Sequence, residues 1–227
     1  MLIPFMNWGP YIFYLLIVLI AADRRFGWFD RFSRSSHLAE KIRKKITYKA
    51  LILMVLFFKI LYALIETFGQ YYVWSENAFT KLLLERNVVD FNALKQFSGK
   101  LFVFLNNRFG YFIFYSWGRF WMEIAASLVA AASFYLFLIF LKKYRERFFE
   151  EGETELGFLL ALIVGWSNFI IFLPIAFLCV IIISVFRMLI FKEAYTTLGA
   201  PFILAAFIVL LFGGYLISAL GLTSFKV

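Results

Sequence analysis

The sequence of 227 residues has few of the side chains on which metal centres and disulfide frameworks depend. It contains one cysteine (Cys179), one histidine (His37) and 4 prolines, and only 16% of its residues are charged. A single cysteine excludes an internal disulfide and a cysteine metal cluster, and a single histidine excludes a multi-histidine metal site. Walker loops, dinucleotide fingerprints and Ser/His/Asp sets are also missing. We therefore expect no metal site and no cofactor.

Apolar residues are what the sequence has in excess. They make up 63% of the chain, and the mean hydropathy is +0.84. Soluble domains contain roughly 45–50% apolar residues, and a chain of this size cannot bury the surplus in one core. This composition excludes a soluble enzyme, a disordered protein and a disulfide-rich secreted domain. It predicts an all-α, polytopic helical membrane protein that forms a single membrane domain over residues 1–227.

The charge pattern predicts which segments face the cytoplasm. The net charge is +9, with 23 Lys and Arg against 14 Asp and Glu. Basic residues are densest in residues 23–49, which we expect to form a cytoplasmic segment because basic loops stay on that side. Residues 75–110 have mixed charge and are expected outside. Membrane lipids, with anionic headgroups as counterions, are the expected partners, and nucleic acid is not.

Apolar runs long enough to cross roughly 30 Å of hydrocarbon define the predicted spans. Residues 156–191 would form a rod of roughly 54 Å as one helix. We interpret them as a helical hairpin with its turn at Ser167-Asn168, which returns Arg187 and Lys192 to the cytoplasm. The sequence thus predicts about six membrane helices, with five as the alternative. The expected ranges are 2–22, 50–74, 111–141, 156–166, 169–189 and 201–220.

Four ionisable residues are predicted to lie at membrane depth, namely Lys59 and Glu66 in the second span and Arg119 and Glu123 in the third. Charges inside a bilayer are costly and usually face protein, water or one another. These residues are therefore candidate binding residues on an ion, proton or substrate path. The alternative is a buried structural network between the two helices.

The last third of the chain carries short motifs in a definite order. An acidic turn, Glu151-Gly152-Glu153-Thr154-Glu155, precedes an apolar helix that ends in Gly165-Trp166. Gly199-Ala200-Pro201-Phe202 and Leu210-Leu211-Phe212-Gly213-Gly214 follow. This order over residues 150–220 resembles the prepilin peptidases. In that family a Gly-x-Gly-Asp turn opens a short helix ending in Gly-Trp, and a Pro-Phe pair and a Leu-Phe-Gly helix end come later.

The resemblance implies an aspartic-type membrane endopeptidase that acts on pilin-like substrates. Its two carboxyl groups would be Asp23, at the cytoplasmic end of the first helix, and Glu153, at the place of the motif aspartate. Such a pair activates water when one carboxyl is ionised and the other protonated. Two departures from the family pattern are the glutamate at Glu153 and the replacement of a motif glycine by Glu151.

Three functions therefore remain open. The chain is a degenerate prepilin-peptidase-like protein of a secretion or pilus system, a non-enzymatic membrane subunit or scaffold of a larger complex, or a small transporter or channel. The chain is expected in a bacterial or archaeal plasma membrane, with other membrane subunits or pilin-like substrates as further partners. Whether the chain is an enzyme depends on whether Asp23 and Glu153 act as a pair.

Overall fold

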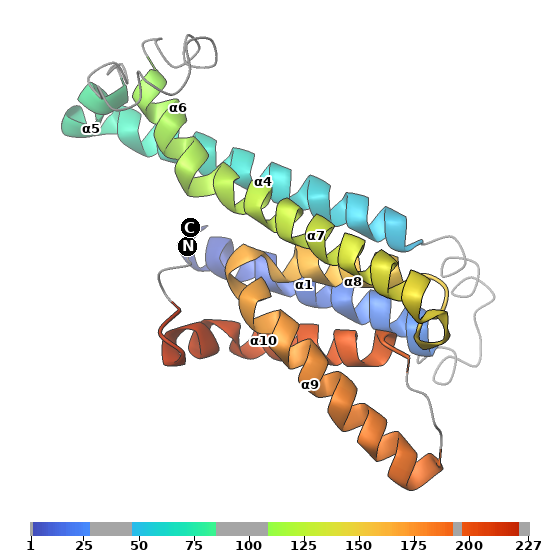
Figure 1. Ribbon diagram of the computed structural model, residues 1–227. Helices are drawn as coiled ribbons and strands as arrows, with labels where there is room; N and C mark the ends of the chain where they lie inside the picture. The colour runs from blue at the N-terminus through green and yellow to red at the C-terminus, as the bar shows by residue number, and fades with distance from the viewer. Residues whose placement is uncertain (1, 28–46, 85–108, 193–196, 223–227) are drawn as a thin grey trace, which may run out of the picture. The chain divides into compact units, whose positions relative to one another are not determined.

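The computed structural model describes residues 2–27, 47–84, 109–192 and 197–222, and every element in these ranges is a helix (Figure 1). Residues 28–46 of the predicted basic segment and residues 85–108 of the predicted outside segment lie beyond them. The elements are α1 (Leu2–Phe26), α4 (Tyr48–Glu76), α5 (Ala78–Leu84), α6 (Gly110–Ser116), the π-helical turn η3 (Trp117–Trp121), α7 (Met122–Tyr144), the 3-10 turn η4 (Glu146–Phe148), α8 (Glu153–Val164), α9 (Trp166–Phe191) and α10 (Gly199–Ala219). The all-α prediction is confirmed.

Four helical stretches in the described ranges are long and apolar enough to cross a membrane. Their most apolar windows are only 22% to 39% buried, so most of their apolar surface faces outward, as in a membrane protein. This number is smaller than the predicted six. The helix α8 has 12 residues, or roughly 18 Å, which is too short for a crossing. The helix α1 carries the charged residues Asp23, Arg24 and Arg25 near its end, and it is not one of the four candidate spans either. The four stretches are Tyr48–Glu76, Gly110–Tyr144, Trp166–Ile190 and Gly199–Ala219.

The chain divides into two compact units, and α8 forms the centre of the first, which comprises Met1–Leu56 and Ala126–Lys226. A helix that is apolar on all sides belongs in a protein interior. Accordingly, Leu156, Leu159 and Leu160 of α8 are fully buried, and α8 contacts α1, α9 and α10. At Gly157 a Cβ atom would lie 2.3 Å from Cδ1 of Leu138 on α7, so a larger residue there would displace the Leu138 side chain.

The predicted break in the long apolar tract is present, but it lies at Gly165 rather than at Ser167-Asn168. Gly165 has φ 80° and ψ 169°, a conformation that glycine adopts readily and other residues avoid. The Trp166 N–H donates to Oγ of the buried Ser127 at 3.0 Å, which satisfies one free donor at the start of α9. Asn168 continues the helix, and its side chain donates to the Val164 carbonyl. The chain therefore turns back at Gly165, as Figure 1 shows.

The second unit, Phe57–Ala125, has an aromatic core of its own. Trp74 of α4 is buried against Phe112 and Tyr115, with the ring centroids of Trp74 and Tyr115 4.9 Å apart. Nε1 of Trp121 donates to Oγ1 of Thr67 at 3.3 Å. These contacts join the end of α4 to α6 and η3.

Candidate functional site

The motif residue Glu153 lies at the first position of α8, directly after a left-handed glycine. Gly152 has φ 83°, and a Cβ atom there would lie 2.9 Å from Cε2 of Tyr48. Both the backbone conformation and the available space therefore require glycine. This turn directs the Glu153 side chain inward, where only 1% of it is exposed.

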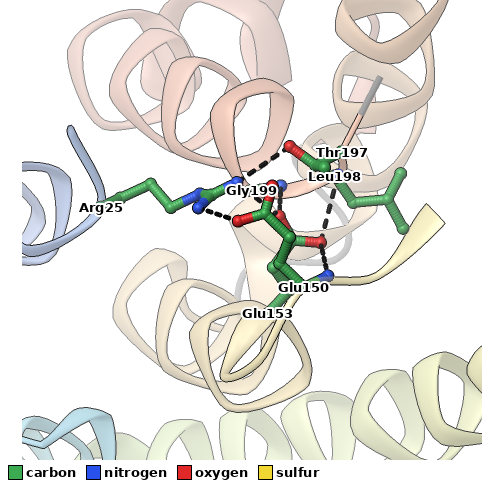
Figure 2. A network of polar contacts seen from close by, with 6 residues as sticks. All are labelled: Arg25, Glu150, Glu153, Thr197, Leu198 and Gly199. Atoms are coloured by element: carbon green, nitrogen blue, oxygen red, sulfur yellow. Dashed lines mark hydrogen bonds and ion pairs between the residues drawn. The ribbon is translucent and has the colours of Figure 1, made fainter. Parts of the chain in front are cut away.

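Each of the two carboxylate oxygens of Glu153 accepts two hydrogen bonds (Figure 2). Oε1 accepts from the Gly199 N–H at 2.8 Å and from Arg25 at 3.3 Å. Oε2 accepts from the N–H groups of Glu150 at 3.1 Å and Leu198 at 3.3 Å. A carboxylate has about four acceptor sites, so these donors fill it. Two of them belong to the start of α10, where a negative group also suits the helix dipole.

Arg25, in the last turn of α1, joins three separate parts of the chain. Its guanidinium forms ion pairs with Glu150 and Glu153, and it donates to Oγ1 of Thr197 at 2.9 Å. Figure 2 shows the side chain reaching from α1 to the turn before α8 and the turn before α10. We call Arg25, Glu150, Glu153 and Thr197 the Arg25 network. It ties the end of α1 to the beginnings of α8 and α10.

Gly199 leaves room for this network. A Cβ atom at this position would lie 2.8 Å from Oε1 of Glu153 and 2.9 Å from Nε of Arg25. Real Cβ atoms do not approach side-chain atoms so closely, so any larger residue would displace the carboxylate or the guanidinium. The first residue of α10 is thus fitted to the polar groups that it contacts.

The two glutamates of the network differ in their electrostatic surroundings. The hydrogen bond from Arg25 lowers the pKa of the Glu150 carboxyl, whose side chain is 48% exposed. Burial raises the pKa of the Glu153 carboxyl, although backbone N–H groups and Arg25 oppose this effect. The hydrogen bond with Glu150 raises the pKa of Arg25, which therefore stays charged.

These shifts predict a pH dependence of stability. Because the pKa of Glu150 is lowered, its contribution is present above the ordinary value of 4.5 and is lost as the pH falls through the lowered pKa. The raised pKa of Glu153 acts in the opposite sense: its contribution is present below 4.5 and is lost as the pH rises through the raised value. We expect Glu150→Gln to reduce the loss of thermal unfolding midpoint on acidification below pH 4.5.

Thermal unfolding in detergent at a series of pH values measures this effect. The control is Glu151→Gln, which removes an exposed carboxyl from the same turn. Glu150→Gln and the control should differ on the acid side. If the two variants follow the wild-type profile equally, Glu150 does not contribute through its charge.

Asp23, the other predicted catalytic residue, is half-buried near the end of α1. It precedes Arg25 by two residues, and side chains two apart on a helix point about 200° away from each other. The side chain that α1 extends to Glu153 is that of Arg25. The structure therefore brings Glu153 together with a guanidinium and with Glu150, and the pairing of Asp23 with Glu153 stays a prediction.

The four predicted binding residues all lie in the second unit. Lys59 is buried, with 7% exposure, and Glu123 is near enough to act on it electrostatically. Arg119 and Glu123 are both near enough to Glu66 to act on it electrostatically, with opposite signs. Arg119 lies within η3, and π-helical turns often occur at functional sites. The structure thus brings these charges within electrostatic range, and a role in transport stays a prediction.

Sequence reasoning missed Arg25, Thr197 and the role of Glu150. One signal was available in the sequence. Arg25 closely follows the first predicted span, and the acidic run at residues 150–155 precedes a later helix on the same predicted side of the membrane. Comparisons of the chain with protein-family models, curated proteins and solved structures find no match. The resemblance to prepilin peptidases accordingly stays a prediction.

Proposed function

We propose that this chain is a non-enzymatic membrane subunit of a secretion or pilus assembly in a bacterial or archaeal plasma membrane. Its helices over residues 150–220 would be those that resemble the prepilin peptidases. The observation that supports this function is the set of contacts around Glu153. The residue at the place of the motif aspartate accepts four hydrogen bonds and holds α1, α8 and α10 together.

The chemistry of aspartic peptidases explains why these contacts favour a structural role. Hydrolysis needs an ionised carboxylate beside a protonated carboxyl, with a water molecule bound between them. In this chain the acceptor sites of Glu153 are filled by one guanidinium and three backbone N–H groups. A buried carboxylate with these partners would have to give up a contact before it could bind water.

The same proposal includes a membrane arrangement. The ends of α1, α8 and α10 that meet at the Arg25 network would face the cytoplasm, since basic residues collect on that side. The helix α1 would cross the membrane as a fifth span, which agrees with the lower of the two predicted numbers. The helix α8 would enter the bilayer only partway before the chain turns at Gly165.

A cleavage assay tests the proposal. The purified full chain is reconstituted in liposomes with a pilin-like substrate that carries its leader, and an active prepilin peptidase serves as the positive control. We expect no cleavage above the protein-free background from the wild type or from Glu153→Asp, which restores the family's residue. Glu153→Asp should also lower the thermal unfolding midpoint, because the shorter side chain withdraws from Leu198 and Gly199.

One pattern would overturn the non-enzymatic role. It is cleavage by the wild type that both Asp23→Asn and Glu153→Gln abolish while their unfolding midpoints stay near the wild-type value. The subunit role predicts in addition that the chain, extracted in mild detergent, migrates as part of a larger complex with secretion or pilus proteins. Migration as a single chain under all mild conditions contradicts it.

A further inference from the structure

A cavity of about 260 Å³ lies in the first unit among α7, α9 and α10. Almost all of its wall is apolar, and Arg145 and Ser184 are its polar members. The cavity lies along the second half of α7, the middle of α9 and the beginning of α10. The other lining residues include Leu141, Phe177, Val180, Leu198 and Phe202.

The helices around the cavity expose it to the surroundings of the protein. Toward its C-terminal end α9 leaves the other helices (Figure 1), and Phe177 and Ile181 are 46% and 59% exposed. The helices α7, α9 and α10 belong to the candidate membrane spans, so in a membrane these surroundings would be hydrocarbon. Apolar cavities stay free of water, and one that opens into a bilayer suits an acyl chain.

The charge at the end of the cavity indicates which lipid fits. Arg145 follows directly after the last residue of α7 and is exposed, with its guanidinium 5.7 Å from the centroid of the Tyr144 ring. A guanidinium at the end of a span lies at headgroup depth and matches the geometry of a phosphate. Lys142, Lys143 and Arg147 add positive charge to the same segment. Basic pockets between membrane helices favour anionic headgroups.

We propose that this cavity is a binding site for an anionic phospholipid, with one acyl chain between α7, α9 and α10 and the phosphate on Arg145. The site is separate from the proposed subunit role and does not depend on it. It adjoins the Arg25 network, because Leu198 lines the cavity and donates its N–H to Glu153. The network therefore fixes one wall of the lipid site.

Native mass spectrometry of the full chain in detergent tests the site. Phosphatidylglycerol and phosphatidylcholine with identical acyl chains are titrated separately, and bound lipid is counted. We expect the wild type to favour phosphatidylglycerol about fivefold, the effect of one basic residue at an anionic surface. Arg145→Gln should remove this preference. Ser184→Leu, which fills the cavity, should weaken binding of both lipids while the unfolding midpoint stays near the wild-type value.

Lys143→Gln is the matched control, because Lys143 is basic and exposed in the same segment but does not line the cavity. It should keep the wild-type preference. If Lys143→Gln and Arg145→Gln reduce the preference equally, the attraction is diffuse and the proposed site is wrong. Equal binding of the two lipids by the wild type also overturns it. So does displacement of phosphatidylglycerol by glycerol phosphate, which indicates an anion site without a chain-binding cavity.

Discussion

Replacing Glu153 with alanine is expected to lower the free energy of unfolding by about 3–5 kcal/mol. The carboxylate is 1% exposed, and its loss leaves Arg25 without its buried partner. It also leaves the N–H groups of Leu198 and Gly199 unpaired in the interior. Each unsatisfied buried donor costs about 1–3 kcal/mol, so the total belongs to the largest effects of a single substitution.

Thermal and denaturant unfolding of the full chain in detergent measure this loss. Glu151→Ala is the control, because Glu151 is an exposed carboxylate two residues away. It should change the free energy of unfolding by less than about 0.5 kcal/mol. A loss below about 1 kcal/mol for Glu153→Ala would contradict the structural role of the residue.

Arg25→Met is expected to have the second largest effect, again about 3–5 kcal/mol, because it leaves the Glu153 carboxylate buried without a cationic partner. Methionine keeps an unbranched apolar side chain at this position, so the loss reflects the charge and its hydrogen bonds. The contact to Glu150 contributes less, since half of that side chain is exposed to solvent. Unfolding in detergent provides the measurement, with Lys143→Met as the control for removing an exposed charge.

A double-mutant cycle separates the coupling from the individual losses. Arg25→Met is combined with Glu153→Gln, which keeps the size of the side chain and removes its charge. Residues in one polar network have coupling energies of about 0.5–3 kcal/mol. Additive losses in the double variant would mean that the contact between Arg25 and Glu153 contributes nothing of its own.

The helices could be predicted from local patterns, and the break in the late apolar tract is the clearest case. A rod over residues 156–191 exceeds the membrane thickness, so a turn had to lie within it. The sequence predicted this turn at Ser167-Asn168. The structure places it at Gly165, whose backbone conformation is open mainly to glycine, while Asn168 bonds to Val164 within the next helix.

The number of spans was harder to predict, because apolarity alone does not separate a crossing helix from a buried one. The helix α8 is as apolar as a membrane span, and its residues are buried by protein rather than by lipid. Its 12 residues make the difference. The minimum length of a membrane-spanning helix therefore has to be checked for each helix of a predicted hairpin, not only for the whole apolar tract.

The Arg25 network could not be derived from spacing along the chain. The contacts that Arg25 makes join residues 125 to 172 positions apart, and a local pattern carries no information on such pairs. The resemblance directed attention to Asp23 because the family places a carboxylate at the end of a helix. Arg25, two residues further along α1, contacts Glu153, and a shift of two positions on a helix changes the direction in which a side chain points.

The sequence separation within the Arg25 network has a consequence for biosynthesis. Thr197 and Gly199 are made at least 172 residues after Arg25, an interval of roughly 10–30 s at ordinary translation rates. Glu150 and Glu153, the two groups that neutralise Arg25, are made 125 and 128 residues after it, so α1 is made well before its arginine is paired. Chains whose translation stops before residue 197 lack Thr197 and Gly199, so they cannot complete the contacts around Arg25 and Glu153. The beginning of α10 therefore completes a joint that starts at the end of α1.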